Sequence, residues 1–541
     1  MSVLIRRLCL TTAVSCMSWL MVACGPQQIP SGLVYCSEGN PESFNPQLVT
    51  SGTTIDATSH QIYSRLVDYD TQSGNLVPAL ATSWSMSEDG LSYRFKLREG
   101  VQFQHSSRFT PSRPFNADDV LFSFNRIINT QHPYHWVSRT GYPFFQSIGF
   151  SEQVKLIEKV NDHEIIFYLA RKDASFLSNL ATDFAVILSD EYAQQQLALG
   201  HPENVDHYAI GTGPFTLVKY VKNEYIRYRR NPDFWGEPAK VDMLVFDITP
   251  KSTVRLAKLI AGDCSVSALP KAGELPVIGQ HKELNIESQP GLNVAFWAFN
   301  TLKPPLDDVR VRSALAHAVD KQHILRAVYQ NTAVEAIGVL PPASWAYDNN
   351  KGLIDYNPQK ARDLLKEAGI KNLSIDIWAM PVARAYNPNT LKTAELIQSD
   401  LANVGVKVNI ISYDWSVFSQ RLSRDEYDSV LIGWNADNSD PDNFFTPLLS
   451  CSAMLSNNNR SRWCSPEFDT ILARAKDVST QAERKVIYQQ AEAFLAEQIP
   501  MLSLAHAKRV ALTRHDITGM QLTPFGGISF AHTGLIQPET N

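Results

Sequence analysis

The sequence lacks the charge pattern and the long apolar runs that mark several large functional classes. Its 49 basic side chains are outnumbered by 55 acidic ones, so a formal charge of −6 provides no basic field for a phosphate backbone and points away from nucleic acid. Beyond the N-terminus no apolar run approaches the roughly 20 residues that span a bilayer, and no internal repeat or low-complexity tract occurs. The chain has 541 residues, and 44% of them are hydrophobic. This length is sufficient for three or four domains of about 150 residues or for two large lobes.

The motifs of common catalytic and cofactor sites are also absent. The sequence contains no Gly-x-Ser-x-Gly elbow, Walker loop or His-Glu-x-x-His pair, and Gly211, Thr212 and Gly213 lack the third glycine of a dinucleotide loop. The acidic run at 437–442 lacks the central glycine and closing glutamate of a calcium loop, and no Cys-x-x-Cys pair offers tetrahedral zinc spacing. We therefore expect no enzyme, no metal site and no resident cofactor.

The N-terminus carries an export signal. Arg6 and Arg7 precede an apolar and small-residue run at 8–23, which is too short to cross a membrane. The residues that end at Cys24 resemble a bacterial lipoprotein lipobox, with Met21 where leucine is usual. We predict a signal peptide at 1–23, lipidation of Cys24, and a periplasmic protein held at the membrane by its lipid alone. The alternative is cleavage by ordinary signal peptidase, which leaves Cys24 as a thiol.

The cysteines that follow the signal suggest disulfides. If Cys24 carries lipid, four cysteines remain in an oxidising compartment, and four allow three pairings. Cys451 and Cys464 enclose a loop rich in serine and asparagine, which favours a local bridge between them. That choice leaves Cys36 and Cys264 as a long-range pair.

The first half of the chain is predicted to be β-rich and antiparallel. Residues 83–87 and 91–97 flank a turn at Glu88, Asp89 and Gly90, which is typical of a hairpin, and residues 215–220 and 224–229 form a second one. Between them, Asn116 is a suitable N-cap for a helix with Asp118 and Asp119 in its first turn. We expect a mixed first lobe at 24–290, completed by about 508–541.

The pattern changes near residue 291. Asn357 and Pro358 begin a helix that Gly369 ends, a strand follows at 373–377, and a helix at 390–403 leads to strands at 406–411 and 427–434. Strands joined by crossover helices imply a parallel sheet. The sequence therefore predicts an α/β fold in two unlike lobes, the second at 291–507, with a C-terminal tail that crosses back to the first.

Two loops of the predicted parallel sheet carry opposite charges. Arg384 follows the strand that ends near Trp378, and Asp437 follows the strand that ends at Trp434. Ligands of open α/β sheets bind beside such strand ends, where arginine suits a carboxylate and aspartate suits an ammonium. Together they can hold the two ends of a zwitterion. One alternative is that Arg384 and Asp437 pair with each other or with surface partners. Another is that Trp378, Tyr386 and Trp434 are ordinary core rather than the wall of a site.

These residues and several longer segments resemble a known family, the peptide-binding components of bacterial ABC transporters. The matching segments are residues 33–39 (LVYCSEG), 44–47 (FNPQ), 51–54 (SGTT), 116–120 (NADDV), 211–215 (GTGPF), 304–312 (PPLDDVRVR), 378–382 (WAMPV) and 440–445 (DPDNFF). The resemblance implies a two-lobed periplasmic binding protein of the clamshell type and the disulfides Cys36–Cys264 and Cys451–Cys464.

The same resemblance implies the function and its residues. Asp437 is expected to bind the amino group of a peptide and Arg384 its carboxylate, and further ligand contacts are expected from Thr50, Ser51, Gly52, Tyr386, Trp434, Asn435 and Ala436. The expected partners are short peptides and an inner-membrane ABC permease, and the protein is expected to be a monomer.

The sequence departs from the dipeptide binders at two positions beside these charges. Ala385 and Ala436 stand where proline and glycine are expected. The lipobox also resembles that of haem-binding lipoproteins built on the same scaffold. The alternative functions are therefore haem capture, with haem as a transported ligand, and the binding of antimicrobial peptides by a Sap-type protein.

Overall fold

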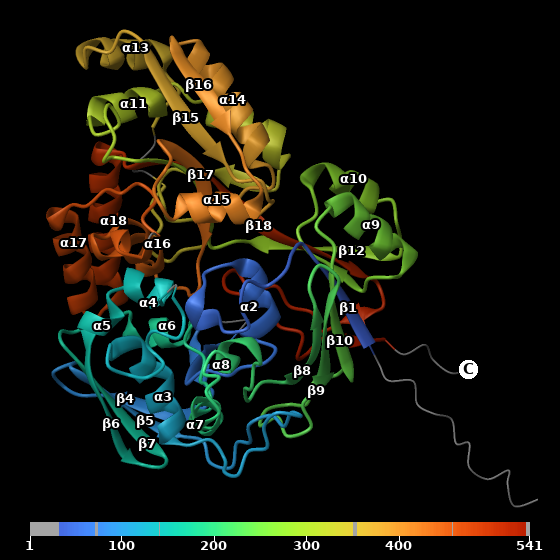
Figure 1. The fold of residues 1–541 in the computed structure, drawn as a ribbon. Coiled ribbons are helices and arrows are strands. Elements are labelled where there is room, and N and C mark those ends of the chain that lie inside the picture. Colours follow the sequence, from blue (N-terminus) through green and yellow to red (C-terminus); the bar gives the residue numbers. More distant parts are fainter. Residues whose placement is uncertain (1–31, 71–73, 140, 350–353, 457, 537–541) are drawn as a thin grey trace, which may run out of the picture.

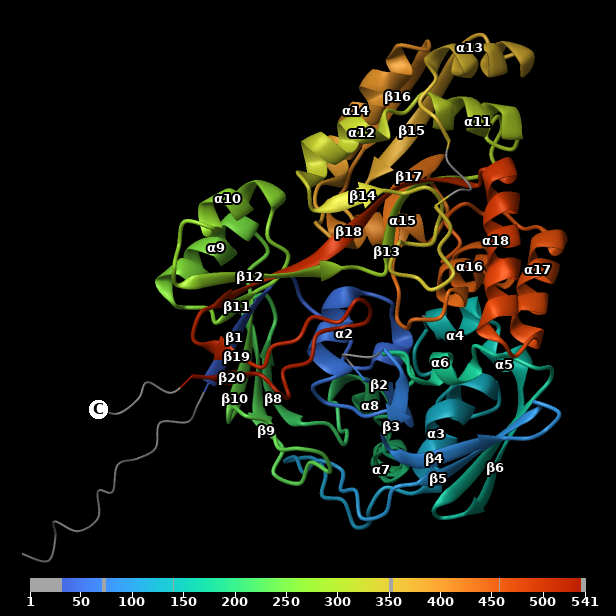
Figure 2. The same cartoon turned by 180° about the vertical axis from the view of Figure 1, so that it is seen from behind.

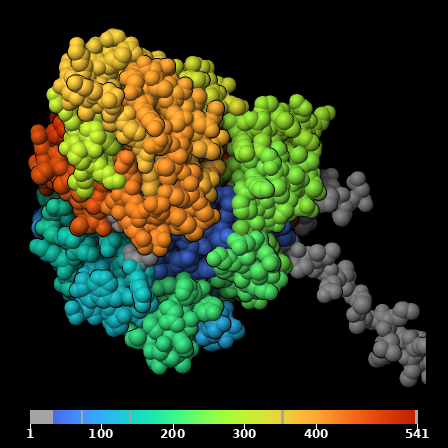
Figure 3. Space-filling view, turned by 45° about the horizontal axis from the view of Figure 1, so that its top comes forward, coloured from blue at the N-terminus to red at the C-terminus, as the bar shows by residue number. Residues whose placement is uncertain are grey.

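Two large hydrophobic clusters divide the molecule. The computed structural model describes residues 32–70, 74–139, 141–349, 354–456 and 458–536. One cluster consists of residues between 33 and 268 joined by Ile517, Ile528 and Phe530, and the other of residues between 292 and 507 joined by Phe525. We call the bodies around them the first and second lobe. Both receive side chains from the C-terminal tail, and in the space-filling view the yellow and orange surface of the second lobe lies directly against the blue and teal surface of the first (Figure 3).

A single twisted sheet runs through both lobes. Its strand order is β16-β15-β17-β13-β18-β11-β1-β10-β9-β8, and β12 and β14 pair with β18 off this path. The strands of the first lobe and the connection are β1 (Gly32–Ser37), β8 (Phe215–Val221), β9 (Tyr225–Arg230), β10 (Met243–Ile248), β11 (Val266–Ser267) and β12 (Leu284–Pro290). Those of the second lobe are β13 (Asn293–Phe299), β14 (Ala333–Glu335), β15 (Leu373–Ala379), β16 (Val406–Ile411), β17 (Ser429–Asn435) and β18 (Met501–Arg514).

The long strand β18 connects the lobes. Its N-terminal half pairs with β13 and β14, and its C-terminal half pairs with β11 and β12. Seen from behind, β18 crosses beside β12 from one lobe to the other (Figure 2). The tail then contains β19 (Ile517–Thr518) and β20 (Gly534–Leu535), and its residues Ile517, Ile528 and Phe530 join the cluster of the first lobe.

A separate antiparallel sheet lies at the far end of the first lobe. It has the order β4-β5-β7-β6, and the strands are β4 (Ala81–Met86), β5 (Ser92–Leu97), β6 (Val154–Asn161) and β7 (Glu164–Leu169). The short pair β2 (Val67–Tyr69) and β3 (Leu76–Pro78) precedes it. First-lobe helices are α2 (Gly52–Thr58), α3 (Ala117–Ile128), α4 (Pro143–Ser147), α5 (Phe150–Gln153), α6 (Phe176–Leu180), α7 (Asp190–Ala198), α8 (Asn204–His207), α9 (Ser252–Ala261) and α10 (Leu275–Ile278), as Figure 1 shows.

Helices cover the sheet of the second lobe. They are α11 (Val309–His317), α12 (Lys321–Ile324), α13 (Pro358–Glu367), α14 (Thr390–Ala402), α15 (Trp415–Leu422), α16 (Asp442–Leu449), α17 (Pro466–Asp477) and α18 (Gln481–Gln498). β15 is parallel to both β16 and β17, which confirms the predicted crossover arrangement. No helix among the described residues is long and apolar enough to span a bilayer.

The structure confirms the hairpins, helix caps and disulfides that the sequence predicts. β4 pairs with β5 and β8 with β9 as predicted hairpins, and Asn116 caps α3 through its side chain in a capping box with Asp119. Asn357 caps α13 with Pro358 in its first turn. The disulfides Cys36–Cys264 and Cys451–Cys464 are both present.

The expectation that the strands of the first lobe are antiparallel is correct for its hairpins and wrong for β1. β1 pairs in parallel with both β10 and β11. A hairpin is visible in sequence because its two strands and its turn are contiguous, whereas β1 meets β10 across about two hundred intervening residues. The local sequence pattern therefore does not predict that pairing.

Candidate functional site

Parallel pairing brings two loops to one edge of the second-lobe sheet. Ala379 at the end of β15 pairs with Leu431 in β17, so the loops that follow both strands leave the sheet on the same side. The first loop carries Arg384 and the second carries Asp437. This is the strand-end position at which ligands bind in open α/β sheets.

Arg384 reaches across to the first lobe. Its guanidinium lies 5.0 Å from the centre of the Trp415 ring, and its Nη1 lies 3.9 Å from Oε1 of Glu38, a residue that directly follows β1. Hydrogen bonds between the backbones of Arg384 and Asn387, both 3.1 Å, tighten the loop. An arginine held by an aromatic face and facing the opposite lobe is well placed for a carboxylate.

Asp437 is buried, and no cationic side chain in the described parts of the chain forms an ion pair with it. Its backbone N–H donates to Oδ1 of Asn443 at 3.1 Å, while its Oδ2 has no hydrogen-bond partner among the described residues. Burial, and then the negative charge of Asp183, raises the pKa of Asp437 well above its usual range. In the described chain no ion pair joins it to Arg384, so the alternative in which the two charges neutralise each other does not hold.

A second orphaned acceptor lies beside Asp437. Asn435 ends β17, and its Oδ1 is buried with no partner in the described structure. Buried acceptors are normally satisfied, so unpaired oxygens two residues apart indicate a place for a donor that the protein itself does not supply. An ammonium group, with three donors and a positive charge, has the matching chemistry.

The first lobe faces these loops with further charged groups. Asp183 binds Nε2 of His60 at 2.7 Å, Nη1 of Arg65 at 3.2 Å and the N–H of Gly527 at 2.7 Å. Burial alone would raise the pKa of Asp183, but His60 and Arg65 lower it to about 2, so the group is ionised. Asp56 on α2 is not neutralised in this way, and burial together with the charge of Glu38 raises its pKa to about 7.

The C-terminal tail connects the two sides of the site. The N–H of Gly526 donates to the carbonyl of Ala436 at 2.8 Å, and Nδ2 of Asn438 donates to the carbonyl of Ser178 at 3.3 Å. Gly526 has a φ of 67°, and a Cβ there would lie 2.9 Å from Oδ2 of Asp183. Glycine is therefore required where the tail passes between Asp183 and Ala436.

The remaining predicted residues fall into two groups. Thr50, Ser51 and Gly52 lead into α2 on the first lobe, partly accessible, with Ser51 at the N-cap position and its hydroxyl 3.2 Å from that of Thr54. Trp434 and Tyr386 are buried inside the second lobe: Trp434 donates from Nε1 to Asn443 at 2.9 Å, and the Tyr386 ring lies against Gly433.

Sequence reasoning missed several charged residues at this site. Glu38 lies within the matching segment at 33–39 but carries no signal of its role, and Asp56 and Asp183 lie in no matching segment. Glu38 and Asp183 are each more than 200 residues from the loop residue on which they act. The adjacent glycines Gly526 and Gly527 are the one available signal, since such pairs mark a close backbone approach.

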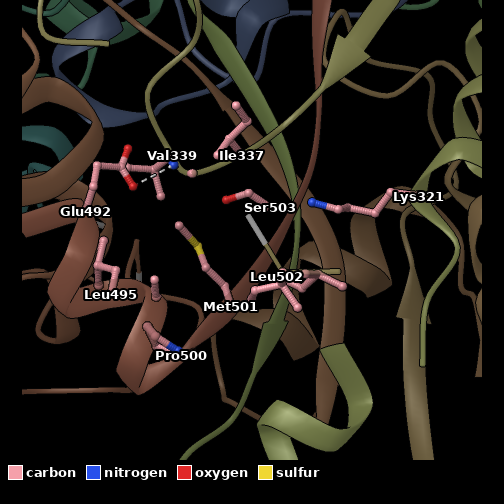
Figure 4. Close-up of a pocket in the computed structure, with 12 residues that line it drawn as sticks. Lys321, Ile337, Val339, Glu492, Leu495, Pro500, Met501, Leu502 and Ser503 are labelled. Carbon is pink, nitrogen blue, oxygen red and sulfur yellow. Dashed lines mark hydrogen bonds between the residues drawn. The ribbon is translucent and has the colours of Figure 1, made fainter. Parts of the chain in front are cut away.

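A different cavity, of about 30 Å³, lies inside the second lobe near α18 and β18 (Figure 4). Glu492 points into it and accepts the backbone N–H groups of Leu340 at 2.8 Å and Val339 at 3.2 Å, with Lys321 on the opposite wall. Burial raises the pKa of Glu492 to about 7. The space suits one or two water molecules and the contacts fasten a loop, so this cavity is structural.

A two-lobed body with a charged site between its lobes defines a solute-binding protein. The chain belongs to the bacterial extracellular solute-binding proteins, family 5, whose middle region matches residues 75–456. It is 44% identical to the dipeptide-binding protein of Escherichia coli (strain K12) over 504 residues, covering 93% of this chain and 94% of that protein. It is 42% identical to heme-binding protein A of Haemophilus influenzae over 498 residues, covering 92% and 91% of the two chains.

The fold is shared with a solved relative. The dipeptide binding protein from Pseudoalteromonas sp. SM9913, solved in complex with Met-Leu, superposes with a TM-score of 0.91 at 45% identity, covering 93% of this chain and all of the other. The expected α/β fold with two lobes is thereby confirmed.

Proposed function

We propose that this protein captures dipeptides and other short peptides between its lobes and delivers them to an inner-membrane ABC permease. The observation that carries the proposal is the unpartnered, buried Oδ2 of Asp437 on one loop, with the guanidinium of Arg384 on the neighbouring loop. The relative of known structure that holds Met-Leu supports the same ligand class.

Each end of a peptide finds a complementary group. The ammonium binds Asp437 and Oδ1 of Asn435, which restores the charge that burial disfavours and keeps the aspartate ionised. The carboxylate binds Arg384 and displaces Glu38 from its 3.9 Å contact. Micromolar capture needs about −8 kcal/mol, which two charge-assisted contacts supply together with backbone hydrogen bonds after ordering costs.

The remaining predicted residues are assigned supporting parts. Thr50, Ser51 and Gly52 offer polar atoms from the first lobe, and Ala436 positions the loop through the bond from Gly526. Tyr386 and Trp434 hold the two loops from inside the second lobe. Lobes at 24–290 with 508–541 and at 291–507 then close over the ligand about the strands that join them.

Capture itself is tested with purified full-length mature protein. We expect native mass spectrometry to detect co-purified short peptides, and calorimetry to show binding of Met-Leu with a micromolar or lower dissociation constant. Because the distance between Arg384 and Asp437 fixes the span of the ligand, we expect a tetrapeptide to bind more weakly than a dipeptide. Failure of every dipeptide to bind at millimolar concentration would refute the function.

Haem capture is the second candidate. The identity of 42% to heme-binding protein A and the lipobox resemblance to haem-binding lipoproteins favour it. Titration with haem distinguishes the two ligands, because bound haem shifts its Soret band. A saturable shift that dipeptides do not compete away would favour haem as the transported ligand.

We further propose that residues 1–23 are removed and that Cys24 is lipidated. Both lie outside the described residues, and the proposal is supported by the lipobox resemblance. Cells that express the protein and are fed labelled palmitate should incorporate label into the wild type, and the Cys24→Ser variant should remain unlabelled and be released from membranes. Equal labelling of both chains would argue against the anchor.

A further inference from the structure

A small cavity lies between the lobes beside the Arg384 loop. Its volume is about 40 Å³, and we call it the basic cavity. The residues that line it are Leu269, Pro270, Lys271, Ala272, Leu275, Tyr329, Thr332, Ala383, Arg384, Ala385, Pro388, Lys508 and Val510. They come from the first lobe, from the second lobe and from β18, so the cavity exists only when the lobes are together.

Its charged residues all have the same sign. Arg384, Lys271 and Lys508 line the cavity, and none of the lining residues is acidic. In the described structure no ion pair joins Lys271 or Lys508 to a carboxylate, and Arg384 has only Glu38 at 3.9 Å. The nearby carboxylate of Glu274 is occupied by the backbone N–H of Lys271 at 3.0 Å and by the hydroxyl of Ser252 at 3.0 Å.

The first-lobe wall of the cavity is held in a strained shape. Leu269 has a φ of 38°, a left-handed backbone conformation that residues other than glycine rarely adopt. The buried Arg255 fixes it by donating to the carbonyls of Ala268 at 3.1 Å and Leu269 at 3.0 Å. Strain of this kind persists only where the surroundings enforce it, and it concentrates at binding sites.

The opposite wall is fixed as well. The hydroxyl of Tyr329 donates to the carbonyl of Tyr386 at 2.9 Å, and the backbone N–H of Lys508 donates to the carbonyl of Thr332 at 2.8 Å. Apolar side chains such as Leu275 and Val510 fill the rest of the lining. Lys271 and Lys508 are exposed residues, so solvent screens part of their attraction for an entering anion.

From this geometry we propose that the basic cavity is a subsite for an acidic side chain on the last residue of the bound peptide. The proposal rests on the function proposed above, in which Arg384 binds the peptide carboxylate. A side chain that leaves the last Cα starts beside Arg384, and a space of about 40 Å³ has room for a carboxylate group. The two lysines then neutralise the second negative charge.

The opposite end of the cleft has the reverse preference. Asp437 is an unpaired carboxyl, and the charge of Asp183 already acts on it. An acidic side chain on the first residue would add a further negative charge there. We therefore infer that the protein prefers an acidic residue at the last position of the peptide and not at the first.

Calorimetry with four dipeptides tests the subsite. On the wild type we expect Ala-Glu and Ala-Asp to bind about tenfold tighter than Ala-Gln, and Glu-Ala to bind no better than Ala-Gln. On the double variant Lys271→Gln, Lys508→Gln we expect Ala-Gln to bind within about twofold of the wild type, and the advantage of Ala-Glu to disappear. The exposed lysines Lys366 and Lys371, replaced together by glutamine, are the matched control and should leave the advantage unchanged.

The outcomes separate this proposal from the function on which it rests. If Ala-Glu and Ala-Gln bind the wild type equally, the basic cavity is not a subsite while peptide capture stands. If the advantage survives in the double variant, its source lies elsewhere and the subsite is again refuted. If no dipeptide binds at all, both proposals fail.

Discussion

The variant Asp437→Asn should raise the dissociation constant for dipeptides by on the order of 100-fold. Oδ2 of Asp437 is buried and unpartnered in the described structure, so a bound ammonium relies on it for its counter-charge. Asparagine keeps the shape and the acceptor but removes the charge. Calorimetry with Met-Leu measures the change, and the exposed Asp363→Asn is the matched control. An unchanged affinity would refute the role of Asp437.

The same variant should become more stable when no ligand is present. Burial raises the pKa of Asp437 well above its usual range, so the folded state holds that proton more tightly than the unfolded state does. The wild type therefore loses stability as the pH rises from about 4 toward the raised pKa, and the variant does not. Unfolding experiments at pH 4 and pH 8 should show a gain for Asp437→Asn that is larger at pH 8. A gain that does not change with pH would place its cause elsewhere.

The second large effect is expected at Arg384. The variant Arg384→Met should weaken binding of dipeptides with a free carboxylate by at least about 30-fold and change the binding of dipeptide amides much less. A C-terminal amide carries no negative charge, so it forms no ion pair with the guanidinium that the variant could remove. Arg384→Lys should restore only part of the loss, because lysine cannot donate two parallel hydrogen bonds to one carboxylate.

A second arginine variant is the control for the Arg384 prediction, and the comparison of acid with amide shows which role Arg384 has. Arg362→Met removes an exposed arginine from α13, a helix that contributes no residue to the site, and should leave both affinities unchanged. Equal losses for the acid and the amide would mean that Arg384 shapes its loop, through Trp415 and Asn387, rather than binding the carboxylate.

Much of the second lobe and both key charges were accessible from sequence. The caps at Asn357 and Gly369 and the alternation in 373–377 are signals spanning a few residues, and they are confirmed in α13 and β15. Parallel strands joined by crossovers place their carboxyl ends together. The neighbourhood of Arg384 and Asp437 then follows from strand order, before any contact is known.

Three things required the tertiary structure. The parallel pairing of β1 with β10, the continuity of one sheet through β18, and the approach of Glu38 to Arg384 all join residues far apart in the chain. No local pattern encodes them, because such contacts are decided by how the two hydrophobic clusters pack. The basic cavity belongs to this group, since its two lysines are more than 200 residues apart in the chain and its lining comes from both lobes.

The sequence by itself determined the class of protein, the local elements and the two opposite charges, because caps, turns and strand periodicity act over short distances. The tertiary structure decided what those charges face. Among the described residues it left Asp437 without a cation and set Glu38 against Arg384, since burial and long-range charge are properties of the folded molecule rather than of any segment.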